Sequence, residues 1–196
     1  MLGSSGQSRE TLQLMRVLGL CGPDSRVAFA DETSEAALLD EVRSGAAVGA
    51  VALGIGHPEA RLRVWRTWHE VVTAGWPALV HPAAVIGDTT RVGEGAMVAA
   101  GVVTTCDVEL GPACLLNTNV AVGHDVVVGE AAVVNPGATL GGGAVIGAGA
   151  LVGSGANVRE GRRVGAGAVV GSGAVVTKDV ADGEVVVGVP ARVMSR

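Results

Sequence analysis

The sequence lacks tyrosine and has few other aromatic residues: the four that it contains make up 2% of the 196 positions, and all of them precede residue 77. A conventional core depends on large side chains to bury surface, so the chain after residue 77 has to pack by repetition. The three cysteines form no CxxC pair. They indicate a reducing compartment, and because the N-terminus has no signal-peptide pattern we expect a cytoplasmic protein.

Basic residues are also scarce, since Lys178 is the only lysine and the net charge is −5. A nucleic-acid binder needs a basic face, so we expect no nucleic-acid partner. Residues 131–158 carry no charge, but they are rich in glycine and lack an interfacial aromatic belt, unlike a membrane-spanning helix. We therefore expect no membrane partner. The contents of 48% hydrophobic and 17% charged residues exclude disorder.

From Val80 onward the sequence repeats every six residues. Sixteen of the 17 residues taken every sixth position from Val80 to Val176 are aliphatic, and in the series four positions later only Arg162 is neither small nor aliphatic. Period six fits neither a helix nor a simple strand alternation. It fits a short strand plus a turn, with one large and one small residue pointing inward. Such strands stack in parallel as a solenoid, whereas a Gly/Ala-rich low-complexity tract would not keep this phase.

The first 79 residues follow a different pattern. Helices are predicted over residues 11–18, 34–43 and 58–74, with strands over 26–30 and 48–53. Strands that alternate with helices predict a small parallel α/β sheet. We therefore expect two domains, a small α/β domain over residues 1–79 and an all-β domain over residues 80–196.

Two motifs could carry chemistry. The turn Gly3-Ser4-Ser5-Gly6 precedes a helix, and the acidic pair Asp31-Glu32 follows the next strand, which is the order of a Rossmann-like phosphate-binding unit. The strand that should precede the turn is almost absent, so we expect the first strand of this sheet to be truncated.

The second motif is Gly123-His124-Asp125, which follows the inward Val122. His124 should project outward, and an adjacent carboxylate can orient a histidine that acts as a general base. From spacing alone, a surface histidine with a chance acidic neighbour is the simpler interpretation. The nearest polar cluster, one hexad earlier, contains Asn117. No pair of histidines has metal-ligand spacing, so we expect no metal, and Cys114 at an inward small position should belong to the core.

The hexads resemble those of left-handed parallel β-helix acyltransferases, in which three hexads form one triangular coil. Over nearly its whole length the chain is similar to bacterial sugar acetyltransferases that act on nucleotide-linked amino sugars, relatives of the sialic acid O-acetyltransferases. Further motifs that carry the resemblance are Gly54-Ile55-Gly56 with Arg61, His81-Pro82, Leu116-Asn117-Thr118 and Gly188-Val189-Pro190-Ala191-Arg192. The resemblance implies a Rossmann-like N-terminal subdomain followed by a left-handed β-helix.

It also implies roles for individual residues. His124 would be the general base that takes the proton from the sugar amine, and Asp125 would increase its basicity. The nucleotide sugar would be held by Gly3, Ser4, Ser5, Gly6, Gln7, Asp31, Glu32, Gly56, Arg61 and Asn117. Acetyl-CoA would lie in a groove between neighbouring subunits of a homotrimer and touch Gly142, Gly143, Ser154 and Ser172. Transfer would be direct, with a backbone amide stabilising the oxyanion.

Two alternatives stay open. The same base could support O-acetylation of a sugar hydroxyl, which the sequence does not separate from N-acetylation. The chain could instead be a non-catalytic β-solenoid scaffold, for which His124 and Asp125 would not be needed.

Overall fold

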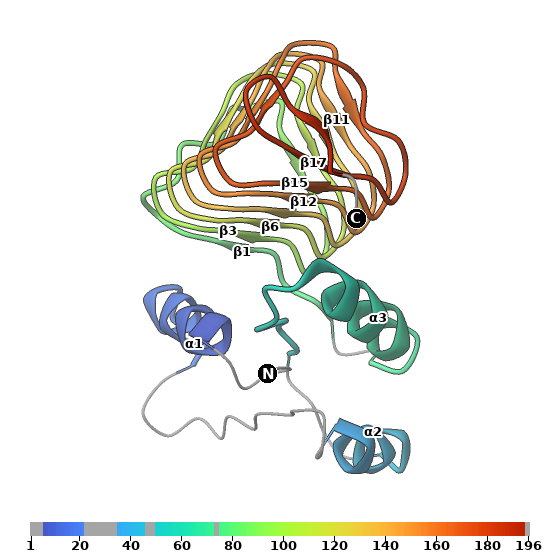
Figure 1. Ribbon diagram of the computed structural model, residues 1–196. Helices are drawn as coiled ribbons and strands as arrows, with labels where there is room; N and C mark the ends of the chain where they lie inside the picture. The colour runs from blue at the N-terminus through green and yellow to red at the C-terminus, as the bar shows by residue number, and fades with distance from the viewer. Residues whose placement is uncertain (1–5, 22–34, 46–49, 73–74, 195–196) are drawn as a thin grey trace.

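The computed structural model describes residues 6–21, 35–45, 50–72 and 75–194. From Leu79 onward the chain winds into a β-solenoid of about six coils, and three short helices lie at its N-terminal end (Figure 1). The coils are stacked triangles, so the solenoid has three flat faces and three corners. Paired residues on adjacent coils are 18 positions apart, as in Leu79 with Met97, which corresponds to three hexads per coil; only in the last coil does the spacing fall to 16, as in Val169 with Val185.

Each face is one sheet of very short strands. Face 1 contains β1 (Leu79–Val80), β3 (Met97–Val98), β6 (Leu115–Leu116), β9 (Val133–Val134), β12 (Leu151–Val152), β15 (Val169–Val170), β17 (Val185–Val187) and β18 (Arg192–Val193). Face 2 contains β4 (Val103–Thr104), β7 (Ala121–Val122), β10 (Thr139–Leu140), β13 (Asn157–Val158) and β16 (Val175–Val176). Face 3 contains β2 (Arg91–Val92), β5 (Glu109–Leu110), β8 (Val127–Val128), β11 (Val145–Ile146) and β14 (Arg163–Val164). All pairings are parallel except that of β17 with β18.

The corners are three-residue turns that keep the same backbone form from coil to coil. Corner 1–2 comprises residues 99–101, 117–119, 135–137, 153–155 and 171–173; corner 2–3 comprises 87–89, 105–107, 123–125, 141–143, 159–161 and 177–179; corner 3–1 comprises 93–95, 111–113, 129–131, 147–149 and 165–167. In all of these turns except 87–89 and 177–179 the third residue has a positive φ, which favours glycine but is also adopted by Asp125 (φ 56) and Ala131 (φ 52). Pro82, Pro112 and Pro136 take the middle position, where no hydrogen bond from the backbone N–H is needed.

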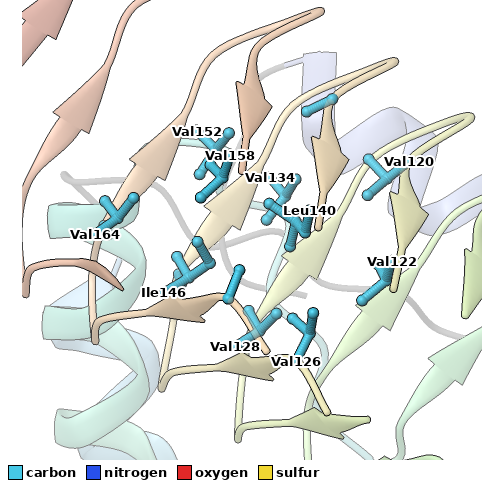
Figure 2. Close-up of a cluster of buried hydrophobic side chains, with 14 of the residues drawn as sticks. Val120, Val122, Val126, Val128, Val134, Leu140, Ile146, Val152, Val158 and Val164 are labelled. Atoms are coloured by element: carbon cyan, nitrogen blue, oxygen red, sulfur yellow. The ribbon is translucent and has the colours of Figure 1, made fainter. Parts of the chain in front are cut away.

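The interior of the solenoid is filled by the two predicted series of inward residues (Figure 2). Val98, Leu116, Val134, Val152 and their counterparts on the other faces are buried, and the alternating small residues let facing walls approach. Burial of one such aliphatic side chain is worth about 1.5–3 kcal/mol relative to exposure. This repeated core, including the buried Cys114, confirms the sequence interpretation.

The predicted Rossmann-like subdomain is not confirmed. The described residues before β1 form the helices α1 (Gly6–Val17), α2 (Glu35–Arg43) and α3 (Pro58–His69) and no strand. Helix α2 matches its prediction, whereas α1 begins five residues earlier than predicted. The predicted strand 26–30 lies outside the described residues, as do positions 48–49 of the other one. Helix α3 ends at His69 rather than at residue 74, because the chain turns there to bury Val72 and Trp76 against Trp65.

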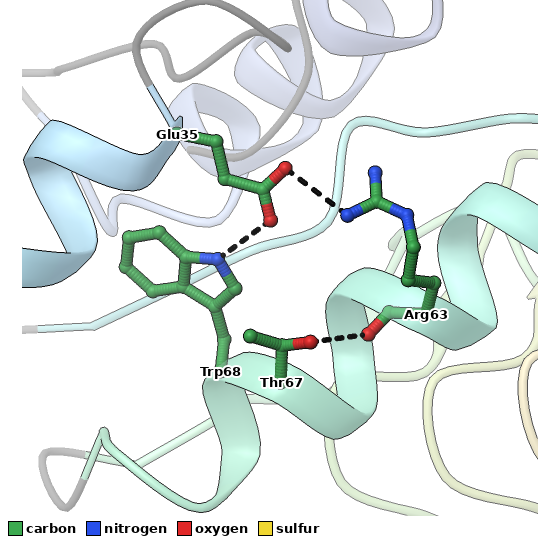
Figure 3. Close-up of polar contacts among 4 residues, drawn as sticks. All are labelled: Glu35, Arg63, Thr67 and Trp68. Atoms are coloured by element: carbon green, nitrogen blue, oxygen red, sulfur yellow. Dashed lines mark hydrogen bonds and ion pairs between the residues drawn. The ribbon is translucent and has the colours of Figure 1, made fainter.

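The helices are tied to each other and to the solenoid. Glu35 at the start of α2 accepts a hydrogen bond from Trp68 Nε1 at 3.1 Å and pairs with Arg63 at 3.4 Å (Figure 3). Helix α1 packs Leu14 and Met15 onto the outer side of face 1, against Met97, Leu115 and Val133. Helix α3 lies along corner 3–1, where Arg66 pairs with Glu130 at 2.6 Å. The N-terminal segment therefore covers the outer side of face 1 at β3, β6 and β9.

Candidate active site

His124 lies at corner 2–3, in the turn between β7 and β8. The hexad phase turns Val122 inward and leaves His124 outside, with 65% of its side chain exposed, as predicted. Asp125 adopts the positive φ of the third turn position, a conformation that aspartate tolerates better than most residues. The turn is anchored on both sides, because the Asp125 N–H donates to Cys106 O at 3.1 Å and the Gly143 N–H donates to His124 O at 2.7 Å.

The His124 ring is oriented by its neighbour. Its Nδ1 lies 2.7 Å from Asp125 Oδ2. An ionised carboxylate can only accept hydrogen bonds, so Nδ1 carries the proton of the neutral imidazole and Nε2 is left with a free lone pair. This is the arrangement that general-base catalysis requires.

The corresponding turn of the next coil, beside this histidine, has no side chains. Residues 141–143 are three consecutive glycines, and Gly142 stands 18 positions after His124. A Cβ built on Gly142 would lie only 2.5 Å from His124 Nε2, so the ring occupies the space that any side chain at position 142 would need. Among the described residues, no acceptor pairs with the Gly142 N–H. The reactive edge of the histidine and an unpaired backbone donor are therefore neighbours.

A groove of about 620 Å³ adjoins the dyad on the side of the earlier coils. It is lined by Asp88, Thr89, Thr90, Arg91, Asp107, Glu109, Asp125 and Val127. Arg91, the basic residue of this lining, is paired with Glu109 at 2.8 Å. The carboxylates of Asp88, Asp107 and Asp125 therefore outnumber the positive charges in the groove. The groove therefore presents negative potential next to His124.

The predicted nucleotide-sugar residues of the N-terminal segment meet one another on the face 1 side of the solenoid. Ser8 Oγ donates to Gly54 O at 2.9 Å, and Gly54 packs so tightly on Ser8 that a Cβ would lie 2.7 Å from its backbone. Gly56 faces the Gln7 side chain, at 3.6 Å from a built Cβ. The start of α1, with Gly6 and Gln7, and the loop at 54–56 thus form one surface. Gly3, Ser4, Ser5, Asp31 and Glu32 lie outside the described residues.

Arg61 has a different place from the one expected of a ligand-binding residue. Its side chain is fully buried, and its guanidinium donates to Leu53 O at 3.1 Å and Ile55 O at 2.9 Å, and also to Ala113 O of corner 3–1. Burial lowers its pKa to about 10, so it stays protonated at neutral pH. Arg61 therefore fastens the 53–55 loop to the solenoid and is not open to direct contact with a nucleotide.

The remaining predicted residues divide between two corners. Gly142 and Gly143 lie at corner 2–3 with His124, whereas Asn117, Ser154 and Ser172 lie at corner 1–2. Asn117 Nδ2 donates to Asn135 Oδ1 of the next coil at 3.2 Å. Within one chain, the structure thus joins His124 to Asp125, Gly142 and Gly143, and it does not join them to the serines or to Asn117.

Other reactive groups do not add to the site. Burial raises the pKa of the Cys114 thiol to about 12, so it is a neutral core residue at physiological pH. No group of three or more potential metal ligands occurs among the residues that the structure describes. None of the described helices is long and apolar enough to cross a membrane.

Sequence reasoning missed two features of the site. The first is the acidic groove, whose residues Asp88, Asp107 and Asp125 come from three successive coils. The second is the contact between His124 and Gly142. Both follow from a spacing of about 18 residues, so applying the coil period to His124 itself would have found them.

No family model and no curated protein sequence matches the chain. Solved structures do. GDP-perosamine N-acetyltransferase from Caulobacter crescentus, in complex with CoA and GDP-perosamine, is 28% identical with a TM-score of 0.89, covering 100% of this chain and 95% of that one. The acetyltransferase domain of PglB from Neisseria gonorrhoeae, also solved with acetyl-CoA, is 25% identical with a TM-score of 0.87, covering 98% and 97%. WeeI from Acinetobacter baumannii is 28% identical with the same TM-score and coverage.

These matches confirm the predicted resemblance to hexapeptide-repeat sugar acetyltransferases and support the prediction that the chain is an acyltransferase. One of these similar structures is an N-acetyltransferase solved in complex with CoA and a nucleotide-linked sugar, GDP-perosamine. Two of the perosamine N-acetyltransferase structures carry a histidine replaced by alanine or by asparagine.

Proposed function

We propose that the chain is an acetyl-CoA-dependent N-acetyltransferase that acts on the amino group of a nucleotide-linked amino sugar. The observation that carries the proposal is the His124–Asp125 pair beside the N–H of Gly142, which has no acceptor in the part of the chain that the structure describes. A base and an oxyanion donor on adjacent coils are the two groups that direct acyl transfer requires.

In the proposed reaction the amine nitrogen attacks the thioester carbonyl carbon while His124 Nε2 accepts the amine proton. Asp125 stabilises the imidazolium through Nδ1, and the Gly142 N–H donates to the oxyanion. The tetrahedral intermediate then collapses, the C–S bond breaks, and the CoA thiolate takes the proton from His124. The new C–N bond and the free thiol balance the step, so no covalent enzyme intermediate or metal is needed.

An amino acceptor suits the acidic groove. Amines are largely cationic near neutral pH, and a cleft lined by carboxylates concentrates cations near the base. A sugar hydroxyl would gain nothing from this field, which favours N- over O-acetylation. The ammonium releases one proton to solvent before the attack, and the neutral amine that remains is the nucleophile whose next proton passes to His124.

The proposal includes a homotrimer, because the predicted residues are divided within one chain. His124 lies at corner 2–3, and face 1, which carries α1 with Gln7, is the face opposite that corner. A nucleotide sugar held near Gln7 and Gly56 could not reach His124 of the same chain. It could reach the His124 of a neighbour, and acetyl-CoA could then touch Gly142 of one subunit and Ser154 and Ser172 of another.

We keep three further predictions within this proposal. The boundary between the two domains falls between residues 79 and 80, within β1. The coil has the left-handed sense that the resemblance implies. The reaction occurs in the cytoplasm, consistent with free thiols at Cys21, Cys106 and Cys114.

The test is acetyl-CoA turnover with UDP-, GDP- and dTDP-linked 4-amino sugars, with the matching hydroxyl sugars as controls. CoA release should be followed by chromatography, because exposed Cys106 would react with a thiol reagent. We expect one amino-sugar class to be acetylated, and His124→Ala to lower kcat by at least about 100-fold. Turnover that is unchanged in His124→Ala would contradict the proposal, and turnover of the hydroxyl sugars alone would favour O-acetylation.

A further inference from the structure

One residue interrupts the aliphatic series that fills the solenoid. Of the 17 inward positions taken every sixth residue from Val80 to Val176, only Thr104 carries a polar side chain. Thr104 is 3% exposed, and the residue that pairs with it on the next coil is Val122. A hydroxyl group in an apolar core costs free energy unless it is hydrogen-bonded, so the partners of Thr104 indicate what it does there.

The Thr104 hydroxyl takes the place of a backbone carbonyl at corner 2–3. In the later turns of this corner the N–H of the first turn residue donates to a carbonyl of the next coil, as the Thr105 N–H does to Val122 O at 3.1 Å. In the first turn, by contrast, the Gly87 N–H donates to Thr104 Oγ1 at 3.0 Å. Thr90 Oγ1 lies 2.9 Å from the same hydroxyl, so Thr104 is hydrogen-bonded on two sides.

A second threonine replaces another bond between the same two coils. At corner 2–3 the N–H of the third turn residue donates to the carbonyl of the middle residue one coil earlier, as the Asp125 N–H does to Cys106 O at 3.1 Å. The Asp107 N–H instead donates to Thr89 Oγ1 at 2.7 Å. Thr89 also lacks the positive φ of Asp107 and Asp125. Hydroxyl groups therefore hold the 87–89 turn in a form that differs from the turns stacked on it.

This irregular turn forms one end of the acidic groove, because Asp88, Thr89 and Thr90 belong to the lining of the groove. Asp88 stands two coils before His124, which at the spacing of paired strands places it about 10 Å from the base along the solenoid axis. That is too far for contact with an amine at His124, but it is within reach of the opposite side of a sugar ring. Carboxylates and hydroxyls are groups that hydrogen-bond sugar hydroxyls. The carboxylates would repel an anionic diphosphate, so the groove suits the sugar ring.

We propose that Thr104 is a positioning residue for the acceptor. Together with Thr89 it holds the 87–89 turn in its irregular form, so that Asp88 contacts the sugar ring whose amine lies at His124. A valine at position 104 would fill the same volume in the core but could not accept the hydrogen bond from the Gly87 N–H. The inference rests on the proposed function, because the groove receives a sugar only if the chain is the amino-sugar acetyltransferase described above.

The test separates the hydroxyl of Thr104 from its contribution to core packing. Thr104→Val keeps the volume and removes the hydroxyl, whereas Thr104→Ser keeps the hydroxyl and removes a methyl group. We expect Thr104→Val to raise KM for the amino-sugar acceptor about 10-fold without changing KM for acetyl-CoA, and Thr104→Ser to retain both values. Asp88→Asn should raise the same KM, and combining it with Thr104→Val should add little. Val98→Ala, which truncates the buried core on face 1, is the control for lost stability and should leave both KM values unchanged.

An unchanged acceptor KM in Thr104→Val would overturn the inference, and so would an equal rise in Thr104→Ser or Val98→Ala, which would assign the effect to lost stability. Hydrogen exchange provides a readout that needs no substrate, since segments 86–91 and 105–109 should exchange faster in Thr104→Val than in Thr104→Ser. If the unmodified chain acetylates no acceptor, the proposed function fails. The exchange rates then decide separately whether Thr104 holds the turn, and equal rates in the two variants would overturn that role.

Discussion

Gly142→Ala is the most direct test of how the fold positions the proposed base. The added methyl group would lie 2.5 Å from His124 Nε2, whereas ordinary contact begins at 3.4 Å, so the ring must move by about 1 Å. A displacement of this size in a catalytic group costs on the order of 100-fold in rate. The backbone of Gly142 is not in the positive-φ region, so the free energy of unfolding should stay unchanged or rise by up to about 1 kcal/mol.

The assay compares kcat for acetyl transfer in the unmodified chain, Gly142→Ala, His124→Ala and the double variant. If the methyl group acts by moving the histidine, adding Gly142→Ala to His124→Ala should change kcat by less than about 2-fold. Ala148→Gly is the control, because it changes one methyl group at the same middle turn position of another corner, where φ is likewise not positive. Unchanged kcat in Gly142→Ala would refute the proposed geometry, and a further 100-fold loss in the double variant would show that the alanine acts on acetyl-CoA instead.

Three further predictions concern the scaffold. Arg61→Met should lower the free energy of unfolding by about 3 kcal/mol or more, measured by urea denaturation, because buried carbonyls lose their donor; a loss below about 1 kcal/mol would contradict this role. In the folded chain, iodoacetamide should alkylate exposed Cys106 and leave Cys114 unmodified, since burial raises the pKa of that thiol to about 12; mass mapping of equal labelling would contradict the core assignment. Trp76→Phe should change stability by less than about 1 kcal/mol, because the buried Nε1–H that it removes has no partner among the described residues, and a thermal melt that drops sharply would show otherwise.

The solenoid was predictable because its signal is local and repeated. Each hexad indicates which of its residues points inward. Because 17 hexads keep the same phase, stacked coils with these residues in the core are the one arrangement that fits. The same phase placed His124 outside and Cys114 inside, both as observed. The N-terminal segment offered no such repetition. Within residues 50–53 of its predicted strand at 48–53, only Leu53 makes a β-bridge, and positions 48–49 lie outside the described residues. Helix α3 stops early because Trp76 packs back on Trp65, a contact that propensity does not encode.

The period, the inward residues, the exposed histidine and the acidic residue beside it were predictable from the amino-acid pattern, because each depends only on positions within one or two hexads. Tertiary structure decided which residues lie across from each other on successive coils and on different faces. In the folded chain Gly142 contacts His124, and the buried Arg61 holds the 53–55 loop against the solenoid. The predicted ligand residues are separated onto opposite sides of the solenoid. The physical reason is that hydrogen bonding between coils sets neighbours 18 residues apart, a distance at which sequence pattern carries the phase of the repeat but not the contacts of individual side chains.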